Sequence, residues 1–280
     1  MKYIKRSRKA TNAILIVLFC VAMILGFWYW QNYTFTCTKV TVATAKVIKP
    51  LTIVQVSDLH GATYGKNNCY LLDAIKQQKP DLICVTGDMY TNGDTAGMDT
   101  AISFMSEATI LAPVYFVAGE HDGDEQYLSA LSNAGVQVLS YSTDSLTING
   151  NHVTMYGIDN VYYSDTFNLF REFDEPHDDS LNILLAHIPN FEAFNWFGPD
   201  LTLCGDTHGG VAQLPLVGPL YFDGTFLPEL SNGEEYVTDK GLFETYTGHV
   251  YVSGGLGNYP YPIRMFNRPE VSVLHIVPEE

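Results

Sequence analysis

The first 57 residues of this 280-residue chain contain no aspartate or glutamate, although they hold eight of its 15 lysines and arginines. All 31 acidic residues follow Ser57, where only seven basic residues remain, so residues 58–280 carry a formal net charge of −24. Such an acidic body repels nucleic acids and other polyanions unless bound cations intervene. We therefore expect no nucleic-acid partner.

Cysteine is also scarce, and no two of the five cysteines show the CxxC spacing of a structural zinc site. Cys84 and Cys204 lie in apolar runs, which favours buried thiols that act as small hydrophobes. A disulfide between Cys37 and Cys69 is an open alternative. Internal repeats and low-complexity segments are absent, and 46 % of the residues are hydrophobic. A single large α/β domain is therefore the expected organisation of the body.

The basic N-terminus precedes 18 uncharged residues, Ala13–Trp30, which as a helix span about 27 Å of a bilayer core of about 30 Å. Aromatic residues close this run at headgroup depth, and the five bases before it place the N-terminus in the cytoplasm. We expect residues 1–35 to form a basic tip and a single-pass signal-anchor helix, and residues 36–280 to form an extracytoplasmic domain at the cell membrane. A cleaved signal peptide is the alternative, although no small-x-small cleavage site follows.

Strand and helix patterns alternate in the first half of the body. Strands are predicted within residues 38–47, 51–61, 81–88 and 113–122, and helices within 67–80, 100–108 and 123–135. Further strands are predicted between residues 136 and 159 and within 181–187, 201–206, 249–255 and 271–277. This order predicts a mixed sheet, or two packed sheets, covered by helices.

Polar clusters follow five of these apolar strands. They are SDLHG with Asp58 and His60, TGD with Asp88, GEHD with Glu120, His121 and Asp122, LLAH with His187, and GDTHGG with Asp206 and His208. Ligands of open α/β sheets bind at the carboxyl ends of strands, and carboxylates mixed with imidazoles suit first-row divalent metals. The clusters therefore predict a metal centre.

The ordered motifs D-x-H, G-D, G-x-H-D, H and G-x-T-H resemble those of the calcineurin-like metallophosphoesterase superfamily. The HGG triplet and the tail SGGLGNYPYPIRMFNRPE are similar to its bacterial membrane-anchored branch, and the resemblance extends over Val40–Val277. It implies an α/β fold, a four-layer α/β/β/α sandwich of two mixed sheets, with two divalent metal ions. It also implies hydrolysis of a phosphate mono- or diester by a metal-bridging hydroxide.

The resemblance implies a role for each residue of the clusters. Asp58, His60 and His208 would hold one ion, Asp88 would bridge, and His187 would hold the second ion with Glu120 and Asp206. His121 would protonate the leaving oxygen as general acid, and Asp122 would orient its imidazole.

Two positions depart from the family pattern, because Glu120 replaces an asparagine and Asp206 replaces a histidine. Four carboxylates against two divalent ions give a formal charge of zero, whereas the family's two carboxylates leave the centre two positive. We therefore expect slower hydrolysis and a second position that prefers Mn, Mg or Ca to softer ions. For the centre as a whole we expect Mn, with Fe, Zn, Mg and Ca as alternatives. The alternative is a weak or missing second ion in a protein that binds or senses a ligand with little turnover.

Other features have simpler interpretations. Gly254 stands where many relatives carry an arginine, and either Arg264 or Arg268 could replace that cation. His152, His249 and His275 lie in predicted strands, and His177 lies in an acidic surface loop, so we expect structural roles for these histidines. The aromatic segment YYSDTFNLF, residues 162–170, is expected in the core, with a substrate groove as the alternative.

Outward attachment near the bilayer favours a small or lipid-linked phosphate ester as substrate.

Overall fold

Two six-stranded sheets form the body of the protein in a computed structural model, which describes residues 2–159, 168–222, 224–231 and 237–279. The first sheet has the order β1-β16-β2-β3-β4-β5. Its strands are β1 (Thr36–Thr44), β2 (Leu51–Val56), β3 (Leu82–Thr86), β4 (Val114–Val117), β5 (Gln137–Val138) and β16 (Glu270–Pro278). Strands β2 to β5 are parallel, whereas β16 runs antiparallel to β2 and parallel to β1.

The second sheet has the order β14-β15-β9-β8-β7-β6. Its strands are β6 (Ser142–Ile148), β7 (Asn151–Gly157), β8 (Leu181–Leu185), β9 (Leu201–Cys204), β14 (Gly241–Glu244) and β15 (His249–Val252). The four central strands are parallel, and the two outer strands, β14 and β6, pair antiparallel. Both sheets are therefore mixed, as the resemblance implies.

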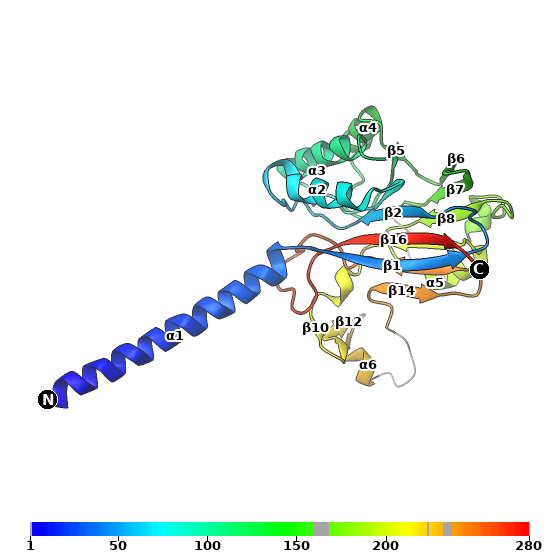
Figure 1. The fold of residues 1–280 in the computed structure, drawn as a ribbon. Helices are drawn as coiled ribbons and strands as arrows, with labels where there is room; N and C mark the ends of the chain where they lie inside the picture. The colour runs from blue at the N-terminus through cyan, green and yellow to red at the C-terminus, as the bar shows by residue number, and fades with distance from the viewer. Residues whose placement is uncertain (1, 160–167, 223, 232–236, 280) are drawn as a thin grey trace.

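Helices cover the outer faces of both sheets. They are α2 (Cys69–Gln78), α3 (Thr95–Ala108) and α4 (Glu125–Asn133) on the first sheet and α5 (Phe191–Phe197) on the second, with short 3₁₀ turns at Lys66–Asn68, Leu169–Arg171 and His208–Gly210. One apolar core lies between the sheets, and two more lie beneath the helices. The arrangement confirms the four-layer α/β/β/α sandwich (Figure 1).

The predicted helices form, with differences at their starts. Helix α3 begins five residues earlier than the sequence predicts, because the side chain of Asp94 accepts a hydrogen bond from Gly97 N at 3.0 Å and caps the helix. Helix α2 begins two residues after the start of its predicted range, and its N-cap residue Asn68 makes no side-chain capping bond: Asn68 Oδ1 accepts from Tyr64 N at 2.8 Å and stabilises the preceding loop.

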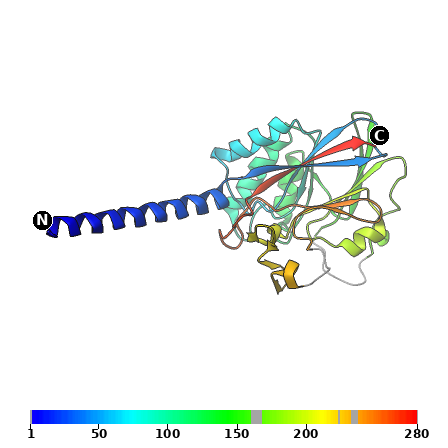
Figure 2. The ribbon, with the colours of Figure 1, turned by 60° about the horizontal axis from the view of Figure 1, so that its bottom comes forward.

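A small lobe between residues 211 and 231 was not predicted. It contains β10 (Gln213–Leu214) paired with β11 (Gly218–Pro219), β12 (Tyr221–Phe222) paired with β13 (Thr225–Phe226), and α6 (Pro228–Ser231). The lobe lies beside the sandwich toward the end from which the N-terminal helix leaves (Figures 1 and 2).

Helix α1 (Lys2–Tyr33) projects from the sandwich as a single long rod (Figures 1 and 2). Its segment Lys9–Tyr33 has a mean hydropathy of 2.5 and is the one span among the described residues that is long and apolar enough to cross a membrane. The side chains of residues 9–30 are exposed, so the body does not cover this part of the helix, whereas Gln31 and Asn32 in its last turn are buried. The helix has the form of a single-pass membrane anchor.

All five cysteines are free, so the alternative of a bridge between Cys37 and Cys69 is wrong. Cys84 and Cys204 are fully buried, which confirms that they pack as small apolar residues. Residues 162–167 of the aromatic segment lie outside the described residues.

Candidate metal centre

All five polar clusters of the sequence meet at one end of the sandwich. In Figure 1 the arrow of β2 points toward the end from which α1 leaves, and the clusters follow the carboxyl ends of β2, β3 and β4 from one sheet and of β8 and β9 from the other. Three groups have ligand atoms within 4.8 Å of one another. They are Asp58, His60 and His208; His60, Asp88 and His121; and Asp58, Asp88 and His187.

The backbone at these strand ends is unusual. Asp58, His60, Asp88, Asp206 and His208 all have a positive φ, between 47° and 70°. Side chains disfavour this left-handed region, and residues held in it concentrate at functional sites. The motif glycines permit the close approach: a Cβ on Gly119 would collide with Asp88 Oδ1, and one on Gly205 would collide with Asp58 Oδ2.

Asp88 lies at the middle of the centre. Its Oδ2 atom is 3.7 Å from His60 Nε2, 3.9 Å from His121 Nε2 and 3.5 Å from His187 Nε2. These separations exceed or only reach the limit of a hydrogen bond. Two ligands that each lie about 2.1 Å from a shared ion are themselves about 3 to 4 Å apart. The side chains therefore surround a space of the size that a divalent ion needs.

The donor atoms at this space fit a metal. Asp58 Oδ2, His60 Nε2 and His187 Nε2 are buried and have no hydrogen-bond partner. Burying an unpaired polar atom costs about 1 to 3 kcal/mol, and three such atoms in one cluster call for a shared cationic partner.

Hydrogen bonds behind the rings set which nitrogen faces the centre. His187 Nδ1 lies 2.7 Å from the carbonyl oxygen of Thr86 and donates to it, which leaves the lone pair of Nε2 directed into the centre. His60 Nδ1 lies 3.2 Å from Thr91 Oγ1. Such outer contacts fix the orientation of metal-binding histidines.

The electrostatics also favour a cation. Burial raises the pKa of Asp58 to about 7. Burial by itself would lower the pKa of His187. The neighbouring carboxylates of Asp88 and Asp58 outweigh burial and raise this pKa to about 10. The interaction with His187 outweighs burial at Asp88 and lowers its pKa to about 2. The carboxylates thus attract positive charge strongly, and a proton on His187 occupies the role that an ion would take.

The two catalytic candidates are neighbours with different contacts. His121 Nδ1 accepts a hydrogen bond from Asn92 N at 3.2 Å. Asp122 accepts from Met89 N at 3.1 Å, from Gly119 N at 3.2 Å and from Asp88 N. Among the described residues, no hydrogen bond or ion pair joins Asp122 to the His121 imidazole, so the expectation that Asp122 orients this ring stays a prediction without support from these contacts. Asp122 instead holds the backbone that carries Asp88.

The two residues that depart from the family differ in placement. Asp206 Oδ1 lies 3.8 Å from His187 Nε2, and its side chain is 39 % exposed. Asp206 N also donates to Asp58 Oδ1 at 3.0 Å. Glu120 is exposed and belongs to none of the three groups of ligand atoms. Asp206, which is also outside the three groups, thus lies beside His187 and Asp58, and the roles of Asp206 and Glu120 as ligands both stay predictions.

Arg264, and not Arg268, is the cation beside the centre. Its guanidinium is buried, donates to Gly254 O at 2.7 Å and lies 3.3 Å from His208 Nδ1. Arginine only donates, so this contact places the proton of a neutral His208 on Nε2, and ligation through Nε2 requires the contact to be released. Arg268 instead stacks on Trp30, 4.6 Å from the ring centroid.

One contact to the centre was missed from the sequence. The ring of Tyr259 stacks on His60 at 4.5 Å between centroids and meets His121 edge-on at 4.9 Å. Tyr259 thereby covers one side of the centre. A tyrosine in a proline-rich loop gives no signal of such a role.

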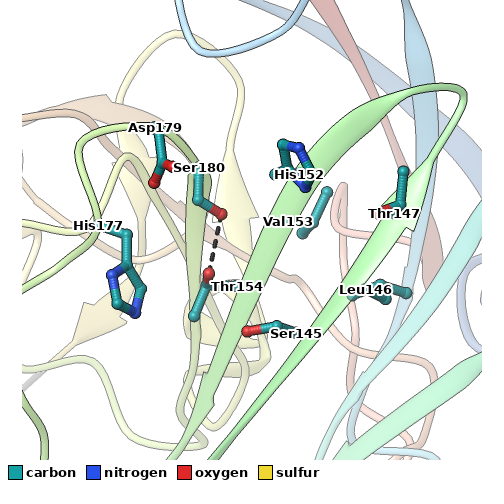
Figure 3. A pocket seen from close by; sticks show the side chains of 9 residues that line it. All are labelled: Ser145, Leu146, Thr147, His152, Val153, Thr154, His177, Asp179 and Ser180. Carbon is teal, nitrogen blue, oxygen red and sulfur yellow. Dashed lines mark hydrogen bonds between the residues drawn. The ribbon is translucent and has the colours of Figure 1, made fainter.

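The histidines outside the motifs occupy structural positions. His152 lies in β7, His275 in β16, and His249 begins β15. His152 and His177 line an open cavity of about 390 Å³ beside β6 and β7, where Thr154 Oγ1 and Ser180 Oγ are 2.8 Å apart (Figure 3). In Figure 3 the two rings stand on separate segments, and no metal group of the described residues includes either of them.

Comparison with known proteins gives a consistent family. A family model described as calcineurin-like phosphoesterase matches residues 51–213. The metallophosphoesterase YkuE of Bacillus subtilis is 30 % identical over 79 % of this chain and 77 % of its own length. The phosphodiesterase YaeI of Escherichia coli is 28 % identical over 81 % and 83 %. A transmembrane protein with metallophosphoesterase domain from Bos taurus is 27 % identical over 80 % of this chain and 52 % of its own length.

Proposed function

Because the chain belongs to the calcineurin-like phosphoesterase family, whose members are metal-binding hydrolases of phosphate esters, we propose that it hydrolyses a small or lipid-linked phosphate mono- or diester at two divalent ions. The observation that carries this proposal is the cluster of three buried, unpartnered donor atoms, on Asp58, His60 and His187. The carboxylate of Asp88 lies beside this cluster and within 3.9 Å of the Nε2 atoms of His60, His121 and His187.

The proposed ligands follow the three groups and the resemblance. Asp58, His60 and His208 would hold one ion, Asp88 would be shared by both ions, and His187 would hold the second ion with Asp206 and Glu120. When bound, the ions would supply positive charge for the phosphoryl oxygens and acidify a coordinated water. Carboxylate oxygens and imidazole nitrogens together suit manganese, with Fe, Zn, Mg and Ca as alternatives.

His121 is the proposed general acid. Because Asn92 N donates to Nδ1, a neutral His121 carries its proton on Nε2, which is the nitrogen that faces Asp88 and the centre. Its side chain is 18 % exposed, so a leaving group can reach it. The ring therefore holds its proton where the departing oxygen of the ester needs one.

The test is metal content and turnover of the full chain in detergent. We expect two ions per chain and manganese-dependent hydrolysis of bis(p-nitrophenyl) phosphate, which His121→Ala lowers about a hundredfold. His152→Ala, a histidine of β7 outside the centre, is the matched control and should retain the wild-type rate. Turnover that survives His121→Ala would remove this residue from the mechanism.

A second candidate function is a binding or sensing protein with little or no turnover. The exposure of Asp206 and the position of Glu120 outside the ligand groups favour it, because both weaken the second ion. One ion per chain, no His121-dependent turnover, and a melting temperature that inorganic phosphate raises would support this function over hydrolysis.

The anchor places this chemistry at a membrane. We propose that the basic residues before α1 stay in the cytoplasm and that residues 36–280 lie on the extracytoplasmic side. The apolar span Lys9–Tyr33 supports attachment, and the asymmetry of charge around it supports this orientation.

A further inference from the structure

A cavity of about 350 Å³ joins the end of the membrane helix to the candidate metal centre. It is lined by Asn32 and Tyr33 of α1, His60 and Thr63 of the loop after β2, and Asn258 and Pro262 of the loop before β16, with neighbours of these residues. The cavity thus has a proposed metal ligand at one side and the last turn of α1 at the other.

The loop before β16 is fastened to α1 at the level of its aromatic residues. Trp28 Nε1 donates to Pro262 O at 2.8 Å, and the rings of Phe27 and Phe266 are 5.7 Å apart. Asn32 is fully buried against the loop, where its Oδ1 accepts from Arg264 N at 2.8 Å. In the proposed attachment α1 leaves the bilayer in these turns, which puts the loop at the membrane surface.

Large apolar side chains of this loop face outward. Tyr261 is 68 % exposed, Ile263 is 60 % exposed and Phe266 is 49 % exposed. A contiguous group of this kind is unfavourable in water but favourable in the headgroup layer of a bilayer. The contact of Phe266 with Phe27 places the group against the apolar span itself. Pro262 of this loop and Tyr33 of α1 both line the cavity, so the cavity lies beside this outward-facing group.

We propose that this cavity takes the polar part of an amphiphilic phosphate ester whose hydrocarbon chain stays in the bilayer. The inference rests on the proposed function, because the phosphate must reach the centre that His60 lines. A volume of about 350 Å³ is within the range of small-ligand pockets, about 300 to 1,000 Å³, and holds a headgroup but not a long chain. Tyr259, stacked on His60, borders the path between the cavity and the centre.

Two esters with the same scissile bond test the proposal. The full chain is placed in phosphatidylcholine nanodiscs with manganese, and release of p-nitrophenolate is measured from p-nitrophenyl methyl phosphate and from p-nitrophenyl hexadecyl phosphate. We expect kcat/KM to be at least about tenfold higher for the hexadecyl ester. Thr63→Trp, which fills the cavity from an exposed position, should lower this ratio at least about fivefold.

Thr147→Trp is the matched control, because Thr147 is an equally exposed threonine that lines the cavity of Figure 3, of similar volume and beside β6. Thr147→Trp should leave the ratio of the two kcat/KM values unchanged. Because the hexadecyl ester partitions into the nanodisc equally for both variants, partition cannot explain a difference between them. Equal kcat/KM values for the two esters, or a ratio that Thr63→Trp leaves intact, overturn the cavity proposal while the phosphoesterase function stands.

Hydrolysis of neither ester would instead contradict the phosphoesterase function. The cavity is then tested without turnover, by photo-crosslinking with p-benzoylphenylalanine in place of Thr63 or of Thr147. Adducts with nanodisc phospholipid at position 63 and not at position 147 support a path from the bilayer. Equal yields at the two positions, or no adduct at position 63, overturn it.

Discussion

Asp206 is the residue whose charge distinguishes this centre from the family pattern. A histidine at this position would be a neutral ligand, whereas the aspartate lies 3.8 Å from His187 Nε2 and adds a negative charge. Both the attraction of a phosphate ester and the acidity of coordinated water depend on uncompensated positive charge. Because Asp206 lies close to His187 and Asp58 whereas Glu120 is exposed, we expect most of this effect from Asp206.

Asp206→His should therefore raise kcat/KM for bis(p-nitrophenyl) phosphate about tenfold, or about 1.4 kcal/mol of transition-state stabilisation. Glu120→Asn is the comparison, because it makes the other change toward the family pattern and removes the same charge. We expect it to alter kcat/KM by less than about twofold, as an exposed charge is screened. A larger gain from Glu120→Asn than from Asp206→His would show that Glu120 is the stronger influence on the second ion.

Asp122 gives a second prediction. It separates two roles of this carboxylate, which are holding the backbone at Asp88 and orienting the His121 ring. Its oxygens accept from three backbone N–H groups, including those of Asp88 and Met89. Asp122→Asn places an amide NH₂ against such donors and should destabilise the fold by about 1 to 3 kcal/mol and weaken metal binding. The pH–rate profile should keep its midpoints, because the His121 ring is not its partner. A shifted basic limb with unchanged thermal stability would restore the role of orienting His121.

Residue identities at the centre were predictable because the motifs follow apolar strands and because carboxylates and imidazoles are rarely buried without a partner. The choice of Arg264 over Arg268 as the neighbouring cation and the role of Tyr259 were not predictable. Arg264 reaches His208 across 56 residues, and Tyr259 reaches His60 across a loop with no periodic pattern. Such contacts depend on how the loop before β16 folds back, which local sequence does not determine.

At the scale of elements, the sequence was informative where strands are buried on both faces. Strands β2, β3, β4 and β8 read as continuous apolar runs, and each has almost every side chain buried. The lobe at residues 211–231 was not predicted, because its strands are two residues long and have no alternation to detect. Which sheet each strand joins was also beyond local patterns, as β16 enters between β1 and β2 from the far end of the chain.

The junction of α1 with the loop before β16 makes a third prediction. Asn32 donates to Arg264 O at 3.1 Å and accepts from Arg264 N at 2.8 Å, and the Arg264 side chain contacts His208. Asn32→Ala removes both hydrogen bonds to the backbone of the buried residue Arg264, so we expect a loss of about 1 to 3 kcal/mol in local stability and a several-fold lower kcat. Hydrogen exchange of residues 254–268 and steady-state rates measure the two effects.

Asn12→Ala is the control for this junction, because it makes the same change at an exposed position of the same helix. It should leave both the exchange and the rate unchanged. Equal behaviour of the two variants would mean that α1 anchors the domain without supporting the centre.

At the scale of the whole molecule, the direction of the strands brings the candidate metal centre to the same end of the sandwich as helix α1. Strands β2 to β4 end at the side from which α1 leaves, whereas β1 and β16 run away from it (Figure 1). Asn32 of α1 and His60 of the centre consequently line one cavity. If α1 anchors the protein as proposed, the centre lies near the membrane surface, and the side of the membrane on which it lies decides which esters it meets.

Labelling of the cysteine thiols can show on which side of the membrane the domain lies. Cys69 is exposed, whereas burial raises the pKa of the Cys37, Cys84 and Cys204 thiols and slows their reaction, and Cys20 lies in the membrane span. If the domain is extracytoplasmic, a membrane-impermeant maleimide should label intact cells that express the full chain. Cys69→Ser should abolish most of that label, while permeabilisation should add little to it. Labelling that requires permeabilised cells would place the domain in the cytoplasm, and a labelled product lacking α1 would show that the helix is a cleaved signal peptide.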